Sequence, residues 1–588
     1  LAQPNDEARS EHTQLQKPDE ETQKAIDECM SCHAPDAQGG PSVQIDHLMK
    51  SPHAALGCTT CHSSITETPH TSEMVETPPA CADCHSAASE AFETSVHAMK
   101  DKEKGDHPTC VTCHSEGDPH SVKLYSTWTR KDKVAACTTC HQDLEKMEKY
   151  GPHVGAVTSY NDSFHGRALL KFGSQETAIC VDCHGSHAVL KSSNPSAMTH
   201  ESKVTETCAK CHPGATKAFS TSGSSHMNLT IERDPVLTGV LLFFKGLVGF
   251  MCSFLVLGVF LDLRRSVFGK EPPRCGRFVG VLMSLGYFGI VAAIVQTSFG
   301  FGGGEVSALV GVGLLLVSVT AHKINQKKQG IKKERFYDRF GSSLRVQHLL
   351  LVISFVTLVI TGFPIRNPEN ETFHQLYQAI GGLEVGRYAH RVAGAILIGL
   401  FVYHVFELLW RWGKAGFKFS SWTMLPNKQD VLDFITETRL YMGHKVDPPQ
   451  FGRFHFRSKM DYFAVYWGAP LMGITGLMLW FPVWFGSFLP PNAVPIAFIA
   501  HSDEAVLALI AILVWHLYNS FFNPNHFAAS TPWSIGIVSK EHMEHAHPGE
   551  LKKILAQRGE FDDTDEGSLA EPEKEPAVEK KNDPTEPS

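Results

Sequence analysis

Polar and apolar residues are strongly segregated along this chain of 588 residues. The first 230 or so residues are polar and rich in histidine, with almost no apolar run. Long apolar stretches dominate from about residue 236 to residue 522, and an acidic, proline-rich stretch follows from about residue 562. The chain is long enough for two or three domains, so we expect boundaries near residues 230, 343 and 525.

Seven of the apolar stretches are long enough, or nearly so, to cross a bilayer as helices. They are residues 236–260, 278–299, 306–321, 344–363, 388–412, 460–484 and 494–522, of which the third is the shortest. The pattern therefore predicts a mainly α fold that ends in a seven-helix transmembrane bundle. Residues 231–343 would supply three helices and a linker, and residues 344–525 would supply four. Residues 526–588 are expected to form a tail, disordered from about residue 562 because glutamate, proline and lysine dominate it.

The arrangement of the cysteines indicates which chemistry the polar domain carries. Fourteen of the 16 cysteines fall in seven copies of Cys-x-x-Cys-His, a pattern typical of covalent haem attachment. Two thiols join the haem vinyl groups, and the adjacent histidine binds the iron. Zinc sites and disulfide frameworks also use paired cysteines, but neither explains a histidine after the second cysteine in every copy. The copies are Cys29/Cys32/His33, Cys58/Cys61/His62, Cys81/Cys84/His85, Cys110/Cys113/His114, Cys137/Cys140/His141, Cys180/Cys183/His184 and Cys208/Cys211/His212.

Seven c haems would have to replace an ordinary apolar core in the first 230 residues, with short helices and loops wrapped over them. Each low-spin haem also needs a second axial ligand, and twelve further histidines are candidates. We expect His53, His70, His97, His120, His165, His187 and His226, with His47, His153 and His200 as alternatives to His70. All seven motifs end in histidine, which favours an electron-transfer chain over a catalytic reductase. The domain resembles multihaem cytochromes c, which implies a periplasmic location because haem c is attached outside the cytoplasm.

The distribution of positive charge tests the orientation of the helices. With the polar domain outside, the three predicted cytoplasmic loops hold 5, 8 and 9 lysines and arginines, whereas the periplasmic loops hold only Arg366 and Arg387. This is the positive-inside pattern of an inner-membrane protein with a cytoplasmic C-terminus. Leu1 is not an initiator methionine; we expect a processed terminus, with a fragment as the alternative.

Histidines within membrane helices are rare enough to suggest a function. The last four predicted helices carry His348, His390, His404, His501 and His516. His390 and His404 are 14 residues apart, and His501 and His516 are 15 apart, so each pair is close to four helical turns and lies on one helix face. The two levels suit two stacked b haems with histidine ligands. His390 would face His501, and either His348 or His404 would face His516.

Residues 344–522 resemble the dihaem cytochrome b subunits of membrane formate dehydrogenases and nickel hydrogenases. The resemblance rests on Arg345-Val-Gln-His348, Thr361-Gly-Phe-Pro364, Gly386-Arg-Tyr-Ala-His390, His501 and Trp515-His516-Leu-Tyr518. It implies His390 with His501 for the periplasmic haem b and His348 with His516 for the other. His404 departs from that pattern. The whole arrangement resembles CbcL-type inner-membrane quinol oxidoreductases, in which a multihaem cytochrome c domain is fused to a dihaem cytochrome b domain.

The same resemblance implies menaquinone beside the cytoplasmic haem and places His455 where the family has asparagine. Histidine can bond a quinone carbonyl and exchange a proton. Asp503 and Glu504, next to His501, are the alternative quinone-site residues at the periplasmic end. The three extra helices match no family pattern, and we expect them to have a packing role.

We therefore expect a quinol dehydrogenase that passes electrons from menaquinol through two b haems to seven c haems, and on to a periplasmic multihaem cytochrome. The direction could also be reversed. An anchor subunit that relays electrons within a larger respiratory complex, and a terminal reductase acting at a c haem, are the rival interpretations. A homo-oligomer is also compatible with the sequence, and nothing in the chain predicts a nucleic-acid partner.

Overall fold

The computed structural model describes residues 17–37, 41–71, 74, 81–98, 107–115, 118–150, 155–269, 275–298, 303–329, 335–418, 423–524 and 532–558. Within these ranges the chain is mainly helical, with one sheet of two short strands. His153 and the tail beyond residue 562 lie outside the described residues. The mainly α expectation is confirmed.

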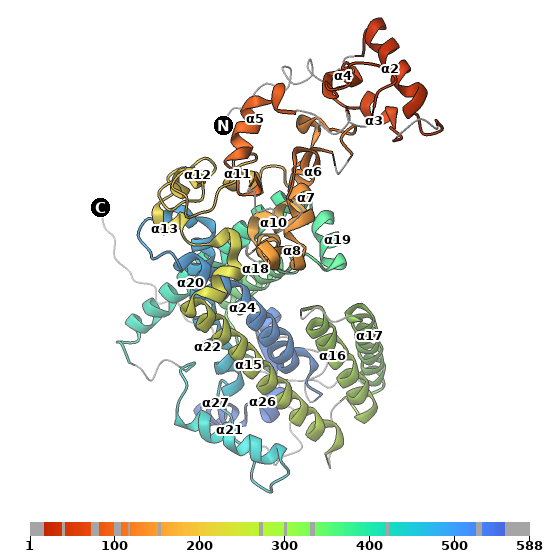
Figure 1. Cartoon of the computed structure of the whole chain (residues 1–588). Helices are drawn as coiled ribbons and strands as arrows, with labels where there is room; N and C mark the ends of the chain where they lie inside the picture. Colours follow the sequence, from red (N-terminus) through yellow and green to blue (C-terminus); the bar gives the residue numbers. More distant parts are fainter. Residues whose placement is uncertain are drawn as a thin grey trace, which may run out of the picture.

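The N-terminal domain consists of short helices and turns (Figure 1). The first cysteine of each Cys-x-x-Cys-His motif lies in one of them: α2 (Glu20–His33), α4 (Cys58–Cys61), the 3-10 turn η2 (Cys81–Asp83), α6 (Cys110–His114), α7 (Arg130–His141), α11 (Cys180–His184) and α12 (Val204–Ala209). The intervening elements include α3 (Ile45–Met49), α5 (Ser86–Glu93), η3 (Val96–Ala98), η4 (Tyr125–Thr127), α8 (Leu144–Tyr150), α9 (Ala156–Asp162), α10 (Phe164–Leu170), α13 (Lys217–Ser220), η5 (Ser224–His226) and α14 (Met227–Arg233). A small apolar cluster of Val134, Tyr160, Leu169 and Ile179 is the main core of side chains among the described residues of this domain.

Each predicted apolar stretch coincides with a helix. The helices are α15 (Pro235–Phe268), α16 (Arg277–Ser298), α17 (Gly304–Gln329), α18 (Ser342–Arg366), α20 (Gly382–Lys414), α22 (Phe456–Trp480) and α24 (Ala493–Ile510), which η7 (Ala511–His516) and η8 (Tyr518–Phe522) continue as π-helical turns. Among the described residues, six helices are long and apolar enough to cross a membrane. The described apolar part of α16, Arg277–Ala293, is shorter, so the count of seven spans stays a prediction.

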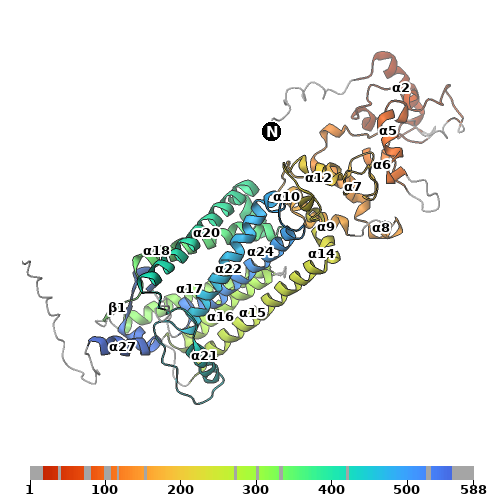
Figure 2. The same cartoon turned by 90° about the vertical axis from the view of Figure 1, so that its left-hand side faces the viewer.

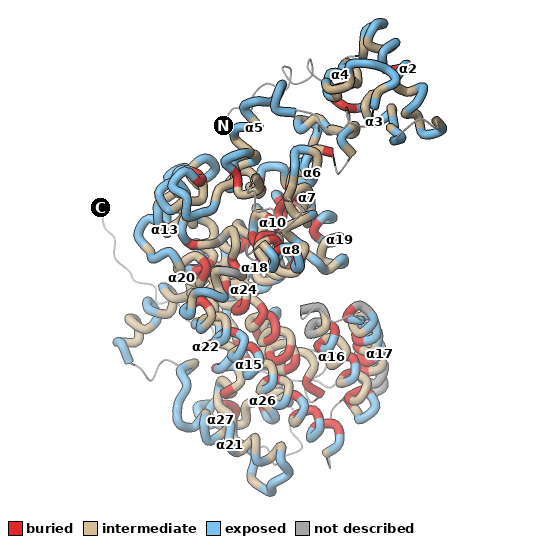
Figure 3. The backbone as a smooth tube through the Cα atoms, in the orientation of Figure 1, coloured by how far each residue is buried: buried red, intermediate tan, exposed pale blue. Residues whose placement is uncertain are grey.

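Of the three helices that precede the residues resembling cytochrome b subunits, α15 packs along the last helix of the bundle, α16 touches its end, and α17 packs against α16. Asp234 caps α15 by accepting hydrogen bonds from Val236 N and Leu237 N, and α15 then lies along α24 and η7. α16 and α17 lie side by side at the edge of the bundle (Figure 1). Figure 3 shows buried residues concentrated on α15 and α16, where their apolar side chains meet those of α24 and η7.

The two ends of the bundle carry different structures (Figure 2). The N-terminal domain lies at one end, beside α19 (Glu371–Ala379) and α23 (Pro482–Phe485). The other end carries α21 (Lys428–Tyr441) and a small folded cap. The cap consists of the antiparallel strands β1 (Phe336–Asp338) and β2 (Ile537–Ser539) with α25 (Pro532–Ile535), α26 (Lys540–Ala546) and α27 (Pro548–Arg558). Part of the expected C-terminal tail is therefore folded, because Val538, Met543 and Leu551 bury apolar surface with Tyr337.

Candidate haem centres and quinone site

Seven pairs of histidine rings lie in the N-terminal domain, and each pair joins a Cys-x-x-Cys-His histidine to one of the seven expected second ligands. The ring centroids are 5.8 Å apart for His33–His70, 6.1 Å for His53–His85, 6.4 Å for His62–His120, 6.1 Å for His97–His141, 6.1 Å for His114–His187, 6.3 Å for His165–His212 and 6.4 Å for His184–His226. An iron held about 2.0 Å from each imidazole nitrogen would separate two ring centroids by about 6 Å. The donor sets therefore fit a six-coordinate haem iron at every motif.

The histidines that the sequence left as alternatives to His70 have other partners. His47 Nδ1 lies 2.5 Å from Asp118 Oδ2, and His200 Nδ1 lies 2.7 Å from Ser202 Oγ. Neither ring is paired with a motif histidine among the described residues. The geometry therefore favours His70 over His47 and His200 for the first motif.

A buried serine shapes the chain before three of the second ligands. His53 N donates to Ser51 Oγ over 3.1 Å, and His97 N donates to Ser95 Oγ over 3.2 Å. Ser163 caps α10 by accepting a hydrogen bond from Gly166 N, which places His165 in the first helical turn. Because these serines bond backbone groups that would otherwise be unsatisfied, they fix the direction in which the following histidine leaves the chain.

The seven motifs are arranged in sequence order. Thiols of neighbouring motifs lie within electrostatic range of one another in six successive contacts: Cys29–Cys58, Cys61–Cys84, Cys81–Cys110, Cys113–Cys137, Cys137–Cys180 and Cys183–Cys208. The first motif lies at the tip of the domain, and the seventh lies nearest the bundle (Figures 1 and 2). The row of sites therefore leads from the bundle to the N-terminal tip.

Two of the predicted attachment cysteines, Cys32 and Cys140, have few contacts that would mark them as site residues. Cys32 is exposed, and its described contact is a hydrogen bond of 3.8 Å from Ser31 Oγ. Cys140 is half-buried and lies within electrostatic range of Cys113 in the preceding motif. Each follows the first cysteine of its own motif by three residues in α2 or α7, and helix residues three apart are neighbours on one face. The haem-attachment role of these two thiols therefore rests on motif spacing and stays a prediction.

The domain contacts the bundle through the segments that flank the His165–His212 pair. Arg167 Nη1 donates to Arg366 O over 3.3 Å, and Lys171 Nζ lies 2.6 Å from Glu369 Oε2. On the other side of the pair, Thr216 Oγ1 donates to Gly486 O over 2.6 Å. These contacts hold the seventh motif against the end of the membrane helices.

Two more histidine pairs lie inside the bundle, at two levels. His390 of α20 faces His501 of α24, and His348 of α18 faces His516 of η7. The ring centroids are 6.3 Å apart in both pairs, which fits two further six-coordinate irons. The bundle thus has the two-level arrangement that the sequence predicts.

Two threonines in equivalent positions orient the His390–His501 pair. Thr361 Oγ1 donates to Thr357 O and lies 2.9 Å from His390 Nδ1; Thr475 Oγ1 donates to Leu471 O and lies 3.0 Å from His501 Nδ1. Because each hydroxyl proton is used within its own helix, each oxygen accepts from the imidazole. The proton is then on Nδ1, and Nε2 is left to bind a metal.

A glycine follows each threonine and makes room for the ring. A Cβ at Gly362 would lie 3.1 Å from His390 Cε1, and one at Gly476 would lie 3.2 Å from His501 Cε1. Contacts this short require the ring to move, so an alanine at either position would displace a candidate iron ligand.

His404 lies outside both pairs. Its Nδ1 is 2.7 Å from Gln347 Oε1, and its Nε2 is 3.0 Å from the Tyr462 hydroxyl, so both ring nitrogens are engaged. The sequence argument for His404 assumed regular α-helical spacing between His501 and His516, but η7 has wider π-helical turns. The geometry favours His348 over His404 as the residue opposite His516.

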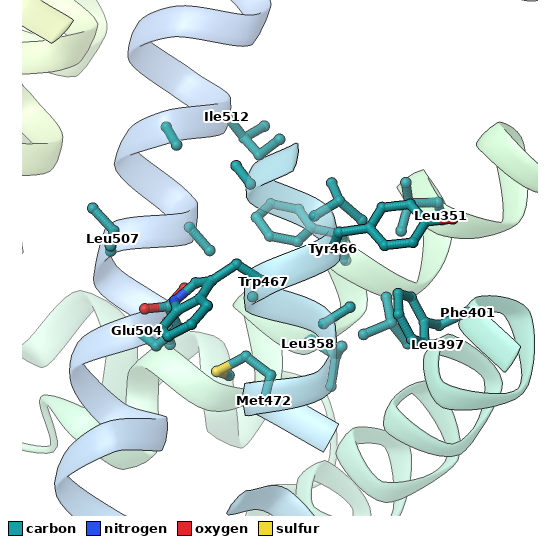
Figure 4. A pocket seen from close by; sticks show the side chains of 18 of the residues that line it. Leu351, Leu358, Leu397, Phe401, Tyr466, Trp467, Met472, Glu504, Leu507 and Ile512 are labelled. Atoms are coloured by element: carbon teal, nitrogen blue, oxygen red, sulfur yellow. The ribbon is translucent and has the colours of Figure 1, made fainter. Parts of the chain in front are cut away.

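Asp503 and Glu504 have different surroundings. Asp503 Oδ1 lies 2.9 Å from Arg366 Nη2 in an ion pair near the N-terminal domain. Glu504 is 4% exposed, and its Oε2 has no hydrogen-bond partner among the described residues. Figure 4 shows Glu504 beside Trp467 and Met472, at the wall of a mainly apolar chamber.

That chamber belongs to a connected cavity of about 3260 Å³ inside the bundle. Pockets for drug-sized molecules are about 300–1,000 Å³, so the cavity exceeds the needs of a single small ligand. Its wall includes the histidines of both bundle pairs and, at the end near the cap, His455, Glu437 and Arg457. One cavity therefore joins the candidate haem sites to the candidate quinone site.

His455 is the N-cap of α22 rather than a free acid–base group. Its Nδ1 accepts the backbone N–H of Arg457 over 3.1 Å, and its Nε2 lies 3.6 Å from Glu437 Oε1. Glu437 Oε1 also lies 2.8 Å from Arg457 Nη2. Burial alone would raise the pKa of Glu437, but the His455 contact and the Arg457 charge outweigh it and hold that pKa below its usual value.

Comparison with known proteins now identifies the C-terminal part. Residues 339–528 match the family model for prokaryotic cytochrome b561. This part of the chain is a cytochrome b561-type domain. Residues 2–63 match the model for cytochrome c554 and c-prime, so the chain fits a fusion of cytochrome c and cytochrome b segments. It is a membrane electron-transfer cytochrome, and the b561-type domain and the c segment support haem b and haem c as its cofactors.

Curated relatives resemble this chain weakly. The chain is 22% identical over 229 residues to the formate dehydrogenase cytochrome b556(fdo) subunit of Escherichia coli K12, and the match covers 38% of this chain and 96% of that subunit. The corresponding subunits of Escherichia coli O6:H1 and O157:H7 match equally well. The family resemblance expected from the sequence is confirmed.

Several site residues escaped the sequence analysis. Thr475 and Gly476 were missed, although the tripeptide Ile-Thr-Gly occurs at both 360–362 and 474–476 and would have indicated them. Glu437 and Asp262 gave no signal, because each acquires its role only from residues far away in the sequence.

Proposed function

We propose that this protein is a quinol dehydrogenase of the bacterial inner membrane, which passes electrons from menaquinol to a periplasmic multihaem cytochrome. The two bundle pairs would hold two b haems, and the seven N-terminal pairs would hold seven c haems. These cofactors would supply one-electron chemistry, while the protein supplies their ligands, spacing and burial.

One observation supports this proposal above the others: the candidate iron sites form a continuous series. It starts at the His348–His516 pair, continues through His390–His501, and reaches His212 of the seventh motif, which lines the same cavity as the bundle pairs together with its partner His165. The remaining six motifs lead on to the tip of the domain. Electrons would therefore leave the protein near the first motif.

The positive-inside pattern supports a periplasmic N-terminal domain and a cytoplasmic cap. The quinone site would then lie on the cytoplasmic side, at the cavity end that His455 lines. The ion pair of Asp503 with Arg366 argues against Asp503 as the proton acceptor of a periplasmic site. Protons released in the cytoplasm while electrons move outward would dissipate membrane potential, at about 2.3 kcal/mol per charge for 100 mV.

A terminal reductase is the less favoured function. It would need a haem with an open coordination position, whereas every motif histidine faces a second histidine. An anchor subunit that needs a separate catalytic protein stays open to experiment.

The test is reduction of the purified, haem-loaded protein by a menaquinol analogue in a stopped-flow spectrometer. We expect b-haem bands to be reduced first and c-haem bands afterwards, with seven covalent and two acid-acetone-extractable haems per chain. His455→Ala should slow the first phase without loss of haem. Absence of any quinol-driven reduction in the isolated protein would favour the anchor function.

A further inference from the structure

A buried cluster of charged side chains surrounds Arg457 at the cap end of the bundle. Arg457 Nη2 lies 2.8 Å from Glu437 Oε1, and Arg457 Nη1 lies 3.9 Å from Asp262 Oδ2. Asp262 Oδ2 also accepts hydrogen bonds of 2.7 Å each from the Tyr518 hydroxyl and Asn523 Nδ2. The cluster thus joins α15, α21, α22 and η8, although α15 lies outside the b561-type match.

The contacts around Arg457 keep Glu437 ionised. Two carboxylates face the guanidinium of Arg457, and Glu437 is the nearer of the two while Asp262 is the more distant. His455 presents its Nε2 to Glu437, since its Nδ1 accepts a backbone hydrogen bond and the ring proton of the neutral form is then on Nε2. These contacts hold the pKa of Glu437 below its usual value, so its carboxylate is available to accept a proton.

Aromatic side chains line the approach to the cluster. Phe254 of α15 lies 6.3 Å from Phe434 of α21, and Phe434 lies 5.6 Å from Phe456 of α22, measured between ring centroids. All three residues line the cavity, together with Glu437 and Arg457. A flat aromatic headgroup such as a quinol can pack against these rings while its hydroxyl approaches the charged cluster.

The cluster also adjoins the candidate haem site. Arg457 Nη1 donates to Asn519 Oδ1 over 3.1 Å, and Asn519 is nearly one turn beyond His516. The Glu437 side chain is 13% exposed and lines the cavity. Glu437 can therefore be reached from the cavity that joins it to the His348–His516 site.

We propose that Glu437 accepts the proton of the bound quinol, and that Asp262 of α15 and His455 are positioning residues that hold the Arg457–Glu437 pair. This inference rests on the proposed quinol dehydrogenase function. It also gives the added helix α15 a role at the quinone site besides packing.

The proton step conserves atoms and electrons. The quinol O–H bond would break and an O–H bond would form on the Glu437 carboxylate, while the haem that His348 and His516 would hold would supply a ferric iron to accept the electron. Glu437 then releases the proton to the cytoplasm and accepts the second one when the second electron leaves. One quinol yields one quinone, two protons and two electrons.

The other ionisable groups near Glu437 and His455 come from three elements. Tyr441 of α21 hydrogen bonds to Arg457. In the cap, Arg339 donates a hydrogen bond of 3.1 Å to His547 Nε2. Burial lowers the pKa of His547 to about 3, and the charge of Arg339 contributes to this shift. Arg453 lies 3.0 Å from Glu550 Oε1, and Glu550 Oε2 also pairs with Arg339. Among the described residues, the charged or titratable groups in direct contact with the Glu437 carboxylate are Arg457 and His455.

The experiment uses the full, haem-loaded chain with E437Q, which keeps the shape of the side chain but removes its basicity. Loss of a general base costs about 100-fold or more, so we expect the rate of b-haem reduction by a menaquinol analogue to fall about 100-fold, with KM nearly unchanged. E437D should recover part of the rate. D433N is the matched control, because Asp433 lies one turn earlier on α21 and bonds only Gln429 among the described partners.

The outcomes separate the two proposals. Failure of the unchanged protein to oxidise quinol contradicts the proposed function itself. Normal quinol oxidation by that protein and also by E437Q overturns the role of Glu437 alone. Loss of an extractable haem in both E437Q and E437D would show that Glu437 is structural and would also overturn this inference. D262N should retain both extractable haems and slow the reaction less than E437Q, since Asp262 acts through Arg457.

Discussion

The hydrogen bond between Thr475 and His501 should influence the reduction potential of the haem b that we propose at His390 and His501. Thr475→Val keeps the shape of the side chain but removes the oxygen that accepts from His501 Nδ1 over 3.0 Å. This bond makes the imidazole a stronger electron donor and so stabilises ferric iron. Its loss should therefore raise the midpoint potential of the haem held by His390 and His501.

The size of the shift follows from the energy of one hydrogen bond. A single intramolecular hydrogen bond contributes about 0.5–1.5 kcal/mol net. For a one-electron couple, a tenfold change in equilibrium constant corresponds to about 59 mV. If the bond acts fully in only one oxidation state, the expected increase is about 20–65 mV. Thr361→Val should give a similar shift, because Thr361 holds the other ligand of the same haem.

Potentiometric titration of the b-haem bands measures this shift directly. Thr357→Val is the matched control, since Thr357 lies one turn before Thr361 and its hydroxyl donates only to Ile353 O among the described contacts. The potential of the haem held by His348 and His516 should not change in any of these variants. A potential within about 10 mV of the original in both Thr475→Val and Thr361→Val would refute the proposed orientation of the ligands.

Three further predictions test other parts of the molecule. His348→Ala should remove one of two extractable haems, whereas His404→Ala should retain both, as acid-acetone extraction can measure. The opposite result would make His404, and not His348, the residue that binds iron opposite His516. His165→Ala should leave b-haem reduction by quinol intact but slow the reduction of c haems in stopped-flow spectra, because His165 faces His212 of the motif nearest the bundle; unchanged c-haem rates would contradict the order of sites. The pKa of Glu437 is lower in the folded state than its ordinary value of about 4.5, so ionised Glu437 stabilises the fold. This stabilisation is fully present above about pH 4.5 and is lost as the pH falls through the folded-state pKa. Glu437→Gln should therefore lower the thermal unfolding temperature most near neutral pH and less at acidic pH, and a difference that grew on acidification would contradict this sign.

Local sequence patterns were sufficient to predict the haem-attachment motifs and the membrane helices. Cys-x-x-Cys-His carries its own chemistry within five residues, and an apolar run needs no distant partner to indicate a membrane helix. Some of the expected second ligands could also be predicted from local patterns, because contexts such as Ser51-Pro-His53 combine the histidine with the serine that orients it.

Only the tertiary structure decided which side chains act together. The choice between His348 and His404 depended on the π-helical turns of η7, and regular helical periodicity cannot predict such turns. The cluster of Asp262, Glu437 and Arg457 depended on packing of α15 against α21 and α22, which are far from α15 in the sequence. A charged residue in a loop or at a helix end looks the same whether it is solvated or buried, and its chemistry changes only when distant residues exclude water from it.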